Sequence, residues 1–156
     1  MQLRFLWVGK TKGAPIRALA EDYLGRLRHW IACEILELPD SPKRRSQRKS
    51  EALTAGRDGI AKYMSGGGKL VVLDERGKQF SSVEFAHWFD EEMQRGTRSI
   101  VFAIGGPDGL DKTADVNAHL RLSLGKMTWT HEMCRVLLLE QVYRAFTIIR
   151  KIPYHK

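Results

Sequence analysis

The sequence predicts an α/β fold in which helices flank a mainly parallel β-sheet. Short apolar runs alternate along the chain with segments whose apolar residues recur at helical spacing, which is the order of a parallel sheet with crossover helices. The apolar run that begins at Ser99 is continuous rather than alternating, as in a strand buried on both faces. The chain has 156 residues, no internal repeat and no linker-like stretch, so we expect a single domain over residues 1–156.

The first half of the chain predicts two strands and two helices. Pro15 suits the first turn of a helix, and Pro39 stops the apolar run that precedes it. In order, the expected elements are a strand at residues 3–8, a helix at 15–28, a strand at 31–38 and a helix at about 51–64. Three glycines at 66–68 close the second helix.

The second half predicts two further strands and three helices, of which the last is long. In order, the expected elements are a strand at residues 69–74 with a turn around Gly77, a helix capped by Ser81 or Ser82 that ends at Gly96, a strand from Ser99, a short helix near 111–120, an irregular stretch at 121–129 and a helix from Thr130 to about Arg150.

The stretch at residues 99–110 is the first candidate for a ligand site. Its apolar run leads directly into Gly105, Gly106 and Gly109, where backbone amides can approach a ligand because no Cβ intervenes. Open α/β folds bind ligands at this carboxyl edge of the sheet. The stretch matches neither the phosphate loop nor the dinucleotide fingerprint, and a tight turn leading into a helix is the alternative interpretation.

The composition argues against a membrane-spanning protein and against a disulfide-rich or zinc-binding one. No apolar run approaches the ~20 residues that span a bilayer, and the first ten residues resemble a strand more than a signal peptide. Cys33 and Cys134 lack C-x-x-C spacing, so we expect neither a disulfide framework nor a zinc site, and we expect a reducing cytoplasm. The formal net charge of +8 is compatible with a polyanionic partner such as RNA.

Several polar stretches are candidates for chemistry. The basic run at residues 43–49 is either a phosphate-contacting loop or a solvated loop. His131-Glu132-x-x-Arg135 has arginine where a zinc-binding helix needs a second histidine, so no metal site is expected. The tail at residues 153–156 combines a ring, an imidazole and a cation, which suit base stacking or simply a frayed terminus.

The terminal helix is apolar on more than one side. Only a narrow strip, including the i, i+4 pair Glu140 and Arg144, is polar. Such a helix is buried on more than one side, which indicates either a partner subunit against one face or an internal helix.

Five motifs carry a resemblance to one family. They are V-V-L-D-x-x-G-K at residues 71–78, F-A-I-G-G-P-D-G-L at 102–110, L-S-L-G-K-M-T-W-T-H-E-M-C-R at 122–135, E-Q-V-Y-R-A at 140–145 and the terminal P-Y-H-K. In their order, spacing and total length, these motifs resemble the bacterial ribosomal RNA large subunit methyltransferase H family of the SPOUT superfamily. The resemblance covers essentially the whole chain.

This resemblance implies an enzyme that uses S-adenosylmethionine to methylate N3 of a pseudouridine in 23S ribosomal RNA. It also implies a deep trefoil knot near the C-terminus and a homodimer that acts on RNA or the ribosome. In such knots, backbone groups supply much of the cofactor recognition. The cofactor-binding positions carried over are Leu73, Gly105, Gly106, Gly109, Leu124, Gly125, Lys126, Met127, Thr128 and Trp129.

The resemblance also suggests residues for catalysis and RNA binding. The candidate catalytic residues are Arg144, Tyr154 and His155, with His155 as the base because an imidazole changes charge nearest neutral pH. The candidate RNA-binding residues are Lys43, Arg44, Arg45, Arg48, Arg135 and Lys156. The family has an arginine at the position of Lys156, and lysine keeps the charge but loses the bidentate fork.

Two other classes of function remain open from the residues alone. One is a non-enzymatic factor that binds RNA or the ribosome, and the other is an α/β enzyme that acts on a small nucleotide. Neither is expected to bind S-adenosylmethionine tightly, so binding of that cofactor separates them from a methyltransferase.

Overall fold

The computed structural model describes residues 1–38, 68–105 and 117–155. Several predictions from the sequence fall outside these ranges. They concern the helix at 51–64, most of the short helix near 111–120, Gly106, Gly109, and the basic residues Lys43, Arg44, Arg45, Arg48 and Lys156.

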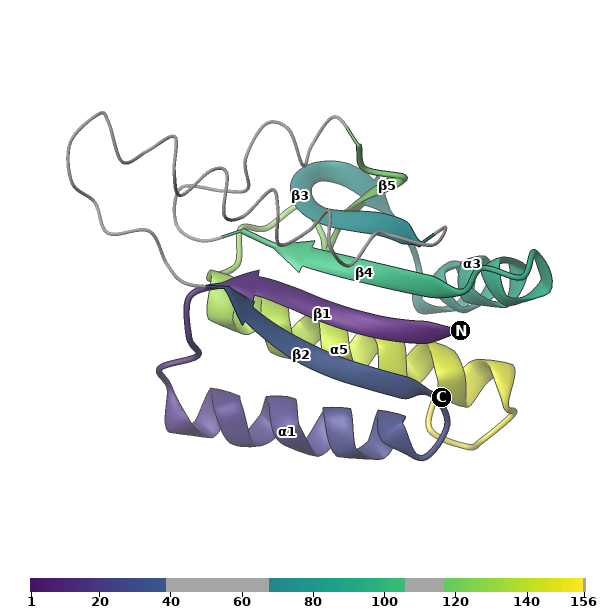
Figure 1. The fold of residues 1–156 in the computed structure, drawn as a ribbon, viewed down its shortest axis with the longest axis horizontal. Helices are drawn as coiled ribbons and strands as arrows, with labels where there is room; N and C mark the ends of the chain where they lie inside the picture. The colour runs from purple at the N-terminus through teal and green to yellow at the C-terminus, as the bar shows by residue number, and fades with distance from the viewer. Residues whose placement is uncertain (39–67, 106–116, 156) are drawn as a thin grey trace.

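A five-stranded sheet in the order β2-β1-β4-β3-β5 forms the centre of the fold (Figure 1). The strands are β1 (Gln2–Val8), β2 (Ala32–Leu38), β3 (Lys69–Gln79), β4 (Ser99–Ile104) and β5 (Leu120–Ser123). Every strand pairing is parallel, so all the carboxyl ends meet at one edge. The α/β fold with a parallel sheet is therefore confirmed.

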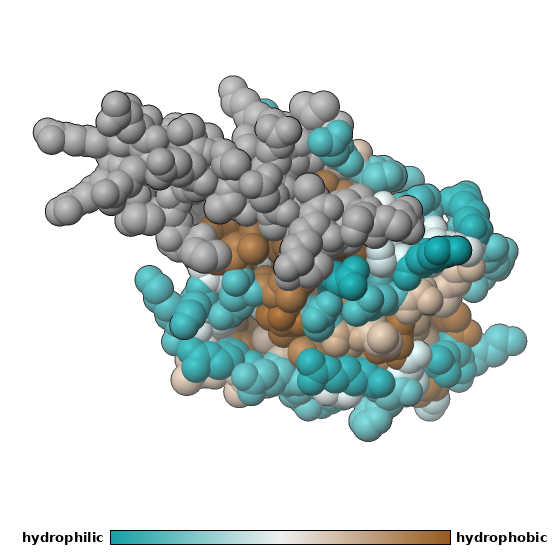
Figure 2. Space-filling view, viewed as in Figure 1, coloured by the Kyte–Doolittle hydropathy of each residue, from teal (hydrophilic) through white to brown (hydrophobic). Residues whose placement is uncertain are grey.

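Three helices cover one face of this sheet (Figure 1). They are α1 (Ala14–Arg28), α3 (Ser82–Gln94) and α5 (His131–Ile149), and α5 packs against both of the others. The main core combines apolar side chains of these helices with those that point to the same face of the strands, such as Phe5 and Phe102. Leu6, Val72 and Val101 belong to a second, smaller cluster on the opposite face, where Figure 2 shows apolar surface in brown around β1 and β2. The central strands are apolar on both faces for this reason.

Local chemistry explains the ends of the helices. Ser81 caps α3 in a capping box, because its hydroxyl accepts from the Glu84 amide while the Glu84 carboxylate accepts from the Ser81 amide. The hydroxyl of Thr130 likewise accepts from the Met133 amide at the start of α5. Pro15 lies in the first turn of α1, as expected.

The region around β3 and β5 differs from the sequence prediction in three ways. β3 continues to Gln79 instead of ending at a turn, residues 120–123 form a strand instead of an irregular stretch, and residues 117–119 are not helical. Both Leu73 and Lys78 pair with Leu122, so β3 contains an irregularity between them. Gly77 permits this close pairing, because a Cβ there would lie 2.7 Å from the backbone of Arg121.

Candidate functional site

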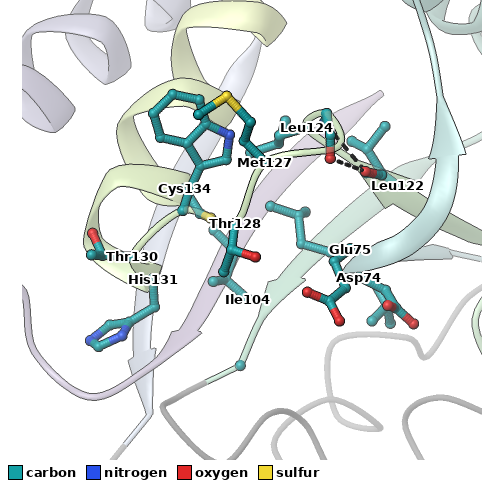
Figure 3. Close-up of a pocket in the computed structure, with 16 residues that line it drawn as sticks. Asp74, Glu75, Ile104, Leu122, Leu124, Met127, Thr128, Thr130, His131 and Cys134 are labelled. Carbon is teal, nitrogen blue, oxygen red and sulfur yellow. Dashed lines mark hydrogen bonds between the residues drawn. The ribbon is translucent and has the colours of Figure 1, made fainter.

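A cavity of about 590 Å³ opens at the carboxyl edge of the sheet (Figure 3). Its walls come from the middle of β3, the end of β4, the end of β5 and the connection from β5 into the first turn of α5. A cavity of this size is typical of small-molecule sites, and its place agrees with the ligand edge of parallel sheets.

Apolar side chains form much of the wall, and they are Val72, Leu73, Ile104, Leu122, Leu124, Met127 and Trp129. Met127 and Trp129 are large apolar residues that stay 73% and 41% exposed, so they leave an uncovered apolar rim on the cavity. Such a rim suits a flat apolar group of a ligand.

A tight turn at Gly125 shapes one wall. Gly125 has a φ of +128°, which side-chain-bearing residues rarely adopt. The hydroxyl of Ser123 donates to the carbonyl of Gly125 at 2.9 Å and accepts from its amide at 3.3 Å. This bonding fixes the backbone of the segment that follows β5 and presents it to the cavity.

The ionisable groups of the cavity are mainly acidic. Asp74 and Glu75 line it together with His131, whereas none of the lining residues within the described ranges is lysine or arginine. The carboxylate of Asp74 accepts from the Arg76 amide at 2.9 Å and lies 3.9 Å from the guanidinium of Arg121. In a chain with a net charge of +8, this lining favours a ligand that carries positive charge and disfavours a nucleoside triphosphate.

Cys134 contributes a thiol to the same cavity. Burial raises the pKa of this thiol, so it stays protonated at neutral pH. A protonated thiol is a poor nucleophile, and the geometry gives no support for a covalent step through Cys134.

The structure places most of the expected cofactor residues around this cavity. Its lining includes Leu73, Gly105, Leu124, Gly125, Met127, Thr128 and Trp129, whereas Lys126 is exposed outside it. The cavity is also lined by residues that were not among the expected cofactor positions, namely Val72, Asp74, Glu75, Ile104, Leu122, Ser123, Thr130, His131 and Cys134. The two acids carry a usable signal, because they directly follow the apolar run of β3 and so reach the carboxyl edge.

A second polar group lies at the other end of α5. The carboxylate of Glu140 accepts from the Arg144 guanidinium at 3.0 Å and from the Tyr154 hydroxyl at 3.1 Å. The guanidinium also stacks on the Tyr154 ring, 4.7 Å from its centroid, and the Tyr23 hydroxyl lies 3.5 Å from that of Tyr154. The tail is therefore bonded to α1 and α5 as far as Tyr154, while His155 is exposed.

This polar network affects the protonation of Tyr154. Burial, the contact with Tyr23 and the negative charge of Glu140 together raise the pKa of Tyr154 far above its usual value. The phenol therefore remains protonated at physiological pH and serves as a hydrogen-bond donor, not as a base.

The two groups are far apart within one chain. From His131 to Arg144 the helix advances by 13 residues, which is about 20 Å at the usual rise. The cavity lies at the edge where the strands end, whereas α5 runs from that edge towards the edge where the strands begin (Figure 1). Tyr154 stacks against Arg144, which lies in the C-terminal half of this helix. A single chain thus does not bring its tail to its own cavity.

The position of Arg135 differs from the one that the sequence predicts. This residue was expected to contact RNA, yet its side chain is fully buried and donates to Thr11 and to the backbone carbonyls of Val8 and Gly9. A guanidinium enclosed in this way does not reach a ligand from its present position. The structure gives it a role inside the protein instead.

Within the described ranges, the chain has neither a metal-binding cluster nor a membrane-spanning helix. No group of three or more His, Cys, Asp or Glu side chains there is arranged to hold a metal ion. No helix in that part of the chain is long and apolar enough to cross a membrane.

Comparisons with known proteins show the family to which this chain belongs. The model of a family described as predicted SPOUT methyltransferase matches residues 1–155. The chain is 42% identical to a ribosomal RNA large subunit methyltransferase H of Citrifermentans bemidjiense, with 99% of each chain covered, and 42% identical to one of Cereibacter sphaeroides, with 100% of this chain and 99% of that one covered.

A solved structure of a probable methylase family protein from Haemophilus influenzae matches the fold with a TM-score of 0.53. The alignment covers 99% of this chain and 70% of that chain at 16% identity. This likeness concerns the fold alone.

Proposed function

Because this chain belongs to the SPOUT methyltransferase family, which its sequence matches over residues 1–155, we propose that it transfers a methyl group from S-adenosylmethionine to N3 of a pseudouridine in 23S ribosomal RNA. Relatives of matching length are named as methyltransferases of the large-subunit ribosomal RNA. The observation that carries the proposal is the acidic, apolar-walled cavity at the carboxyl edge, formed by the segments that carry the family motifs. A ribosomal substrate implies work in the cytoplasm.

The residues of the cavity fit S-adenosylmethionine. The adenine ring suits the apolar wall that includes Leu124 and Trp129, and the fixed backbone after Ser123 offers hydrogen-bonding groups. The carboxylates of Asp74 and Glu75 suit ribose hydroxyls and positive charge. When bound, this cofactor supplies a methyl group activated by a sulfonium.

The chain's own contribution is to position the pseudouridine and to handle its N3 proton. Orientation of two reactants can supply several kcal/mol of the barrier. Arg144 and Tyr154 are the donors that orient the base, and the protonated phenol of Tyr154 leaves proton abstraction to His155. If His155→Ala kept the wild-type single-turnover rate at every pH, this role of His155 would be wrong.

A homodimer is part of the proposal, because the tail and the cavity of one chain are about 20 Å apart along α5. In a two-fold dimer that pairs opposite ends of α5, the tail of each chain lies beside the cavity of its partner. The residues of α5 that do not face the core, together with the tail, are the surface available for this contact. The trefoil knot that the family implies involves residues outside the described ranges and stays a prediction.

Two measurements test the proposed function. Calorimetry is expected to show stoichiometric binding of S-adenosylmethionine, with no comparable binding of ATP. Methyl transfer is then measured on 23S rRNA and on ribosomes, each with and without the target pseudouridine. Transfer that requires the pseudouridine supports the proposal, whereas RNA binding without cofactor binding indicates a non-enzymatic RNA-binding factor.

A further inference from the structure

The loop at residues 9–13, between β1 and α1, is bonded to the first turn of α5. The carboxylate of Glu132 accepts from the amide of Lys12 at 2.8 Å and from the amide of Gly13 at 3.4 Å. A Cβ at Gly13 would lie 3.2 Å from this carboxylate, so the loop passes close to it. Hydrogen bonds from backbone amides to a carboxylate are stronger than neutral ones, so Glu132 holds the backbone of the loop in place.

Arg135 holds the other side of the same loop. Its guanidinium donates to the Thr11 hydroxyl at 2.7 Å and to the carbonyls of Val8 and Gly9 at 2.9 and 3.1 Å, and it lies 5.1 Å from the centre of the Trp7 ring. The side chain is fully buried, and its Nε has no partner among the described residues. Burying an arginine in this way carries a large desolvation cost, which the loop contacts offset.

The consequence is a loop whose two lysines project from a fixed backbone. Thr11 is 3% exposed, whereas its neighbours Lys10 and Lys12 are both exposed. Neither lysine forms an ion pair with a residue that the structure describes. Both charges therefore remain available to an outside anion.

This loop lies beside the candidate cofactor cavity. Glu132 and Arg135 bond to the loop, and His131 and Cys134, from the same stretch of α5, line the cavity. The loop and the cavity are thus separated by a single helical turn.

We propose that the loop at residues 9–13 binds the phosphate backbone of the RNA substrate next to the cavity, through Lys10 and Lys12, with Glu132 and Arg135 as positioning residues. This inference rests on the proposed methyltransferase function and adds an RNA contact to it. A fixed backbone lowers the ordering cost that flexible lysines otherwise incur on binding. Phosphate contacts position a nucleic acid without reading its sequence, which is what a second contact near a reacting base requires.

The first test removes the two charges. Lys10→Gln with Lys12→Gln is expected to weaken binding to 23S rRNA about 10-fold at low salt and to reduce the slope of log K against log salt by about 1.4, since each phosphate contact on a single strand contributes about 0.7. Cofactor affinity, measured by calorimetry, is expected to stay at the wild-type value.

A matched control removes the same net charge from the connection between α3 and β4, which within the described ranges is bonded to neither the tail nor the cavity. Arg95 and Arg98 lie in this connection, and both are exposed. The double variant Arg95→Gln with Arg98→Gln is expected to keep the wild-type salt slope. Equal losses of slope in the two double variants would overturn the proposal, because net charge would then explain the effect.

The second test asks whether Glu132 and Arg135 contribute to RNA binding by holding the loop at residues 9–13 in place. Glu132→Gln keeps the buried arginine, and Arg135→Met keeps both lysines. Each variant is expected to lower the RNA salt slope while retaining the helical content of the wild type, and to be cut faster by trypsin after Lys10 or Lys12. Unchanged cleavage and an unchanged slope in the better-folded of the two variants would overturn the positioning role.

The outcomes separate this inference from the function on which it rests. A wild-type protein that neither binds S-adenosylmethionine nor methylates 23S rRNA refutes the proposed function. A wild-type protein that methylates, together with a Lys10/Lys12 variant of unchanged salt slope, refutes only the loop contact.

Discussion

The two ends of α5 carry functional groups in opposite ways. At the N-terminal end, His131 and Cys134 form part of the wall of an open cavity. At the C-terminal end, Glu140, Arg144 and Tyr154 bond to one another on a partly exposed surface. Under the proposed function, the first end holds the cofactor, whereas the second offers hydrogen-bond donors to the RNA base.

The two arginines of the helix show the same contrast. Arg135 is fully buried and bonds to a loop of its own chain. Arg144 keeps a quarter of its side chain exposed, and the hydrogen bond to Glu140 raises its pKa further, so it stays charged. Under the proposed function, one residue type thus serves architecture at one end of α5 and recognition at the other, because the surroundings of the two arginines differ.

The largest predicted effect tests whether the two ends act in different chains. Gly125→Val strains the cavity wall at a φ of +128°, and Arg144→Ala removes a donor at the far end, so each variant alone is expected to lose roughly 100-fold in methyl transfer. If each site combines both chains, equal mixing of the two variants after refolding restores about a quarter of the wild-type rate, since half of the dimers are mixed and each has one intact site.

In the control for this mixing experiment, every cavity carries the Gly125→Val substitution. Mixing Gly125→Val with a protein that carries both substitutions is expected to restore nothing. Recovery in that control, or no recovery in the first mixture, would contradict a site shared between chains.

The next effect compares the stabilities of two arginine variants. Arg135→Met leaves three acceptors and the Trp7 ring without their partner, and we expect a loss of about 3 kcal/mol in the free energy of unfolding. Arg144→Met breaks a partly exposed pair and is expected to cost about 1 kcal/mol or less. Urea unfolding measures both, and equal losses would remove the contrast between the two ends.

These contrasts also show what the sequence alone predicts. The spacing of apolar residues and the positions of capping and turn residues predicted the main strands and helices. For example, β4 is an apolar run that is buried throughout, and Ser81 caps α3 together with Glu84. The same signals failed at β3 and β5, because the residues from Asp74 to Lys78 look like a turn while Gly77 in fact allows a close strand contact.

The site divides in the same manner. The resemblance to the family predicted the cavity wall at residues 124–129, because this segment is one continuous sequence motif. All of its residues except Lys126 line the cavity. The resemblance placed Arg135 at the RNA, because a cation in a helical motif gives no sign of whether it is buried. Only tertiary packing reveals that Thr11, Val8 and Gly9 surround this side chain.

A smaller effect tests the role of Tyr154. Tyr154→Phe keeps the ring against Arg144 and Tyr143 but removes the bond to Glu140, and we expect about a 10-fold loss in kcat/KM, the usual scale for one hydrogen bond to a charged group. Because the pKa of Tyr154 is raised, the phenol donates throughout the accessible pH range. The pH profile of the variant is therefore expected to run parallel to that of the wild type. A wild-type rate that rises with pH and a variant rate that does not would show that Tyr154 acts as the base, because a base must lose its proton before it acts.

The smallest effect concerns Glu132 at the N-terminal end of α5. Hydrogen bonds from the amides of Lys12 and Gly13 lower the pKa of Glu132, and the charge of Arg135 adds to the shift. A carboxylate with a lowered pKa stabilises the folded chain fully above its unfolded value of about 4.3, and this contribution is lost as the pH falls through the folded value. Glu132→Gln has no such charge, so the wild type is expected to be the more stable protein at pH 7, with a gap that narrows below about pH 4.3. Urea unfolding across this pH range measures the gap.

A gap that stays constant into acid would mean that the loop at residues 9–13 depends on the shape of residue 132 and not on its charge. The electrostatic part of the contrast between the two ends of α5 would then rest on Arg135 alone.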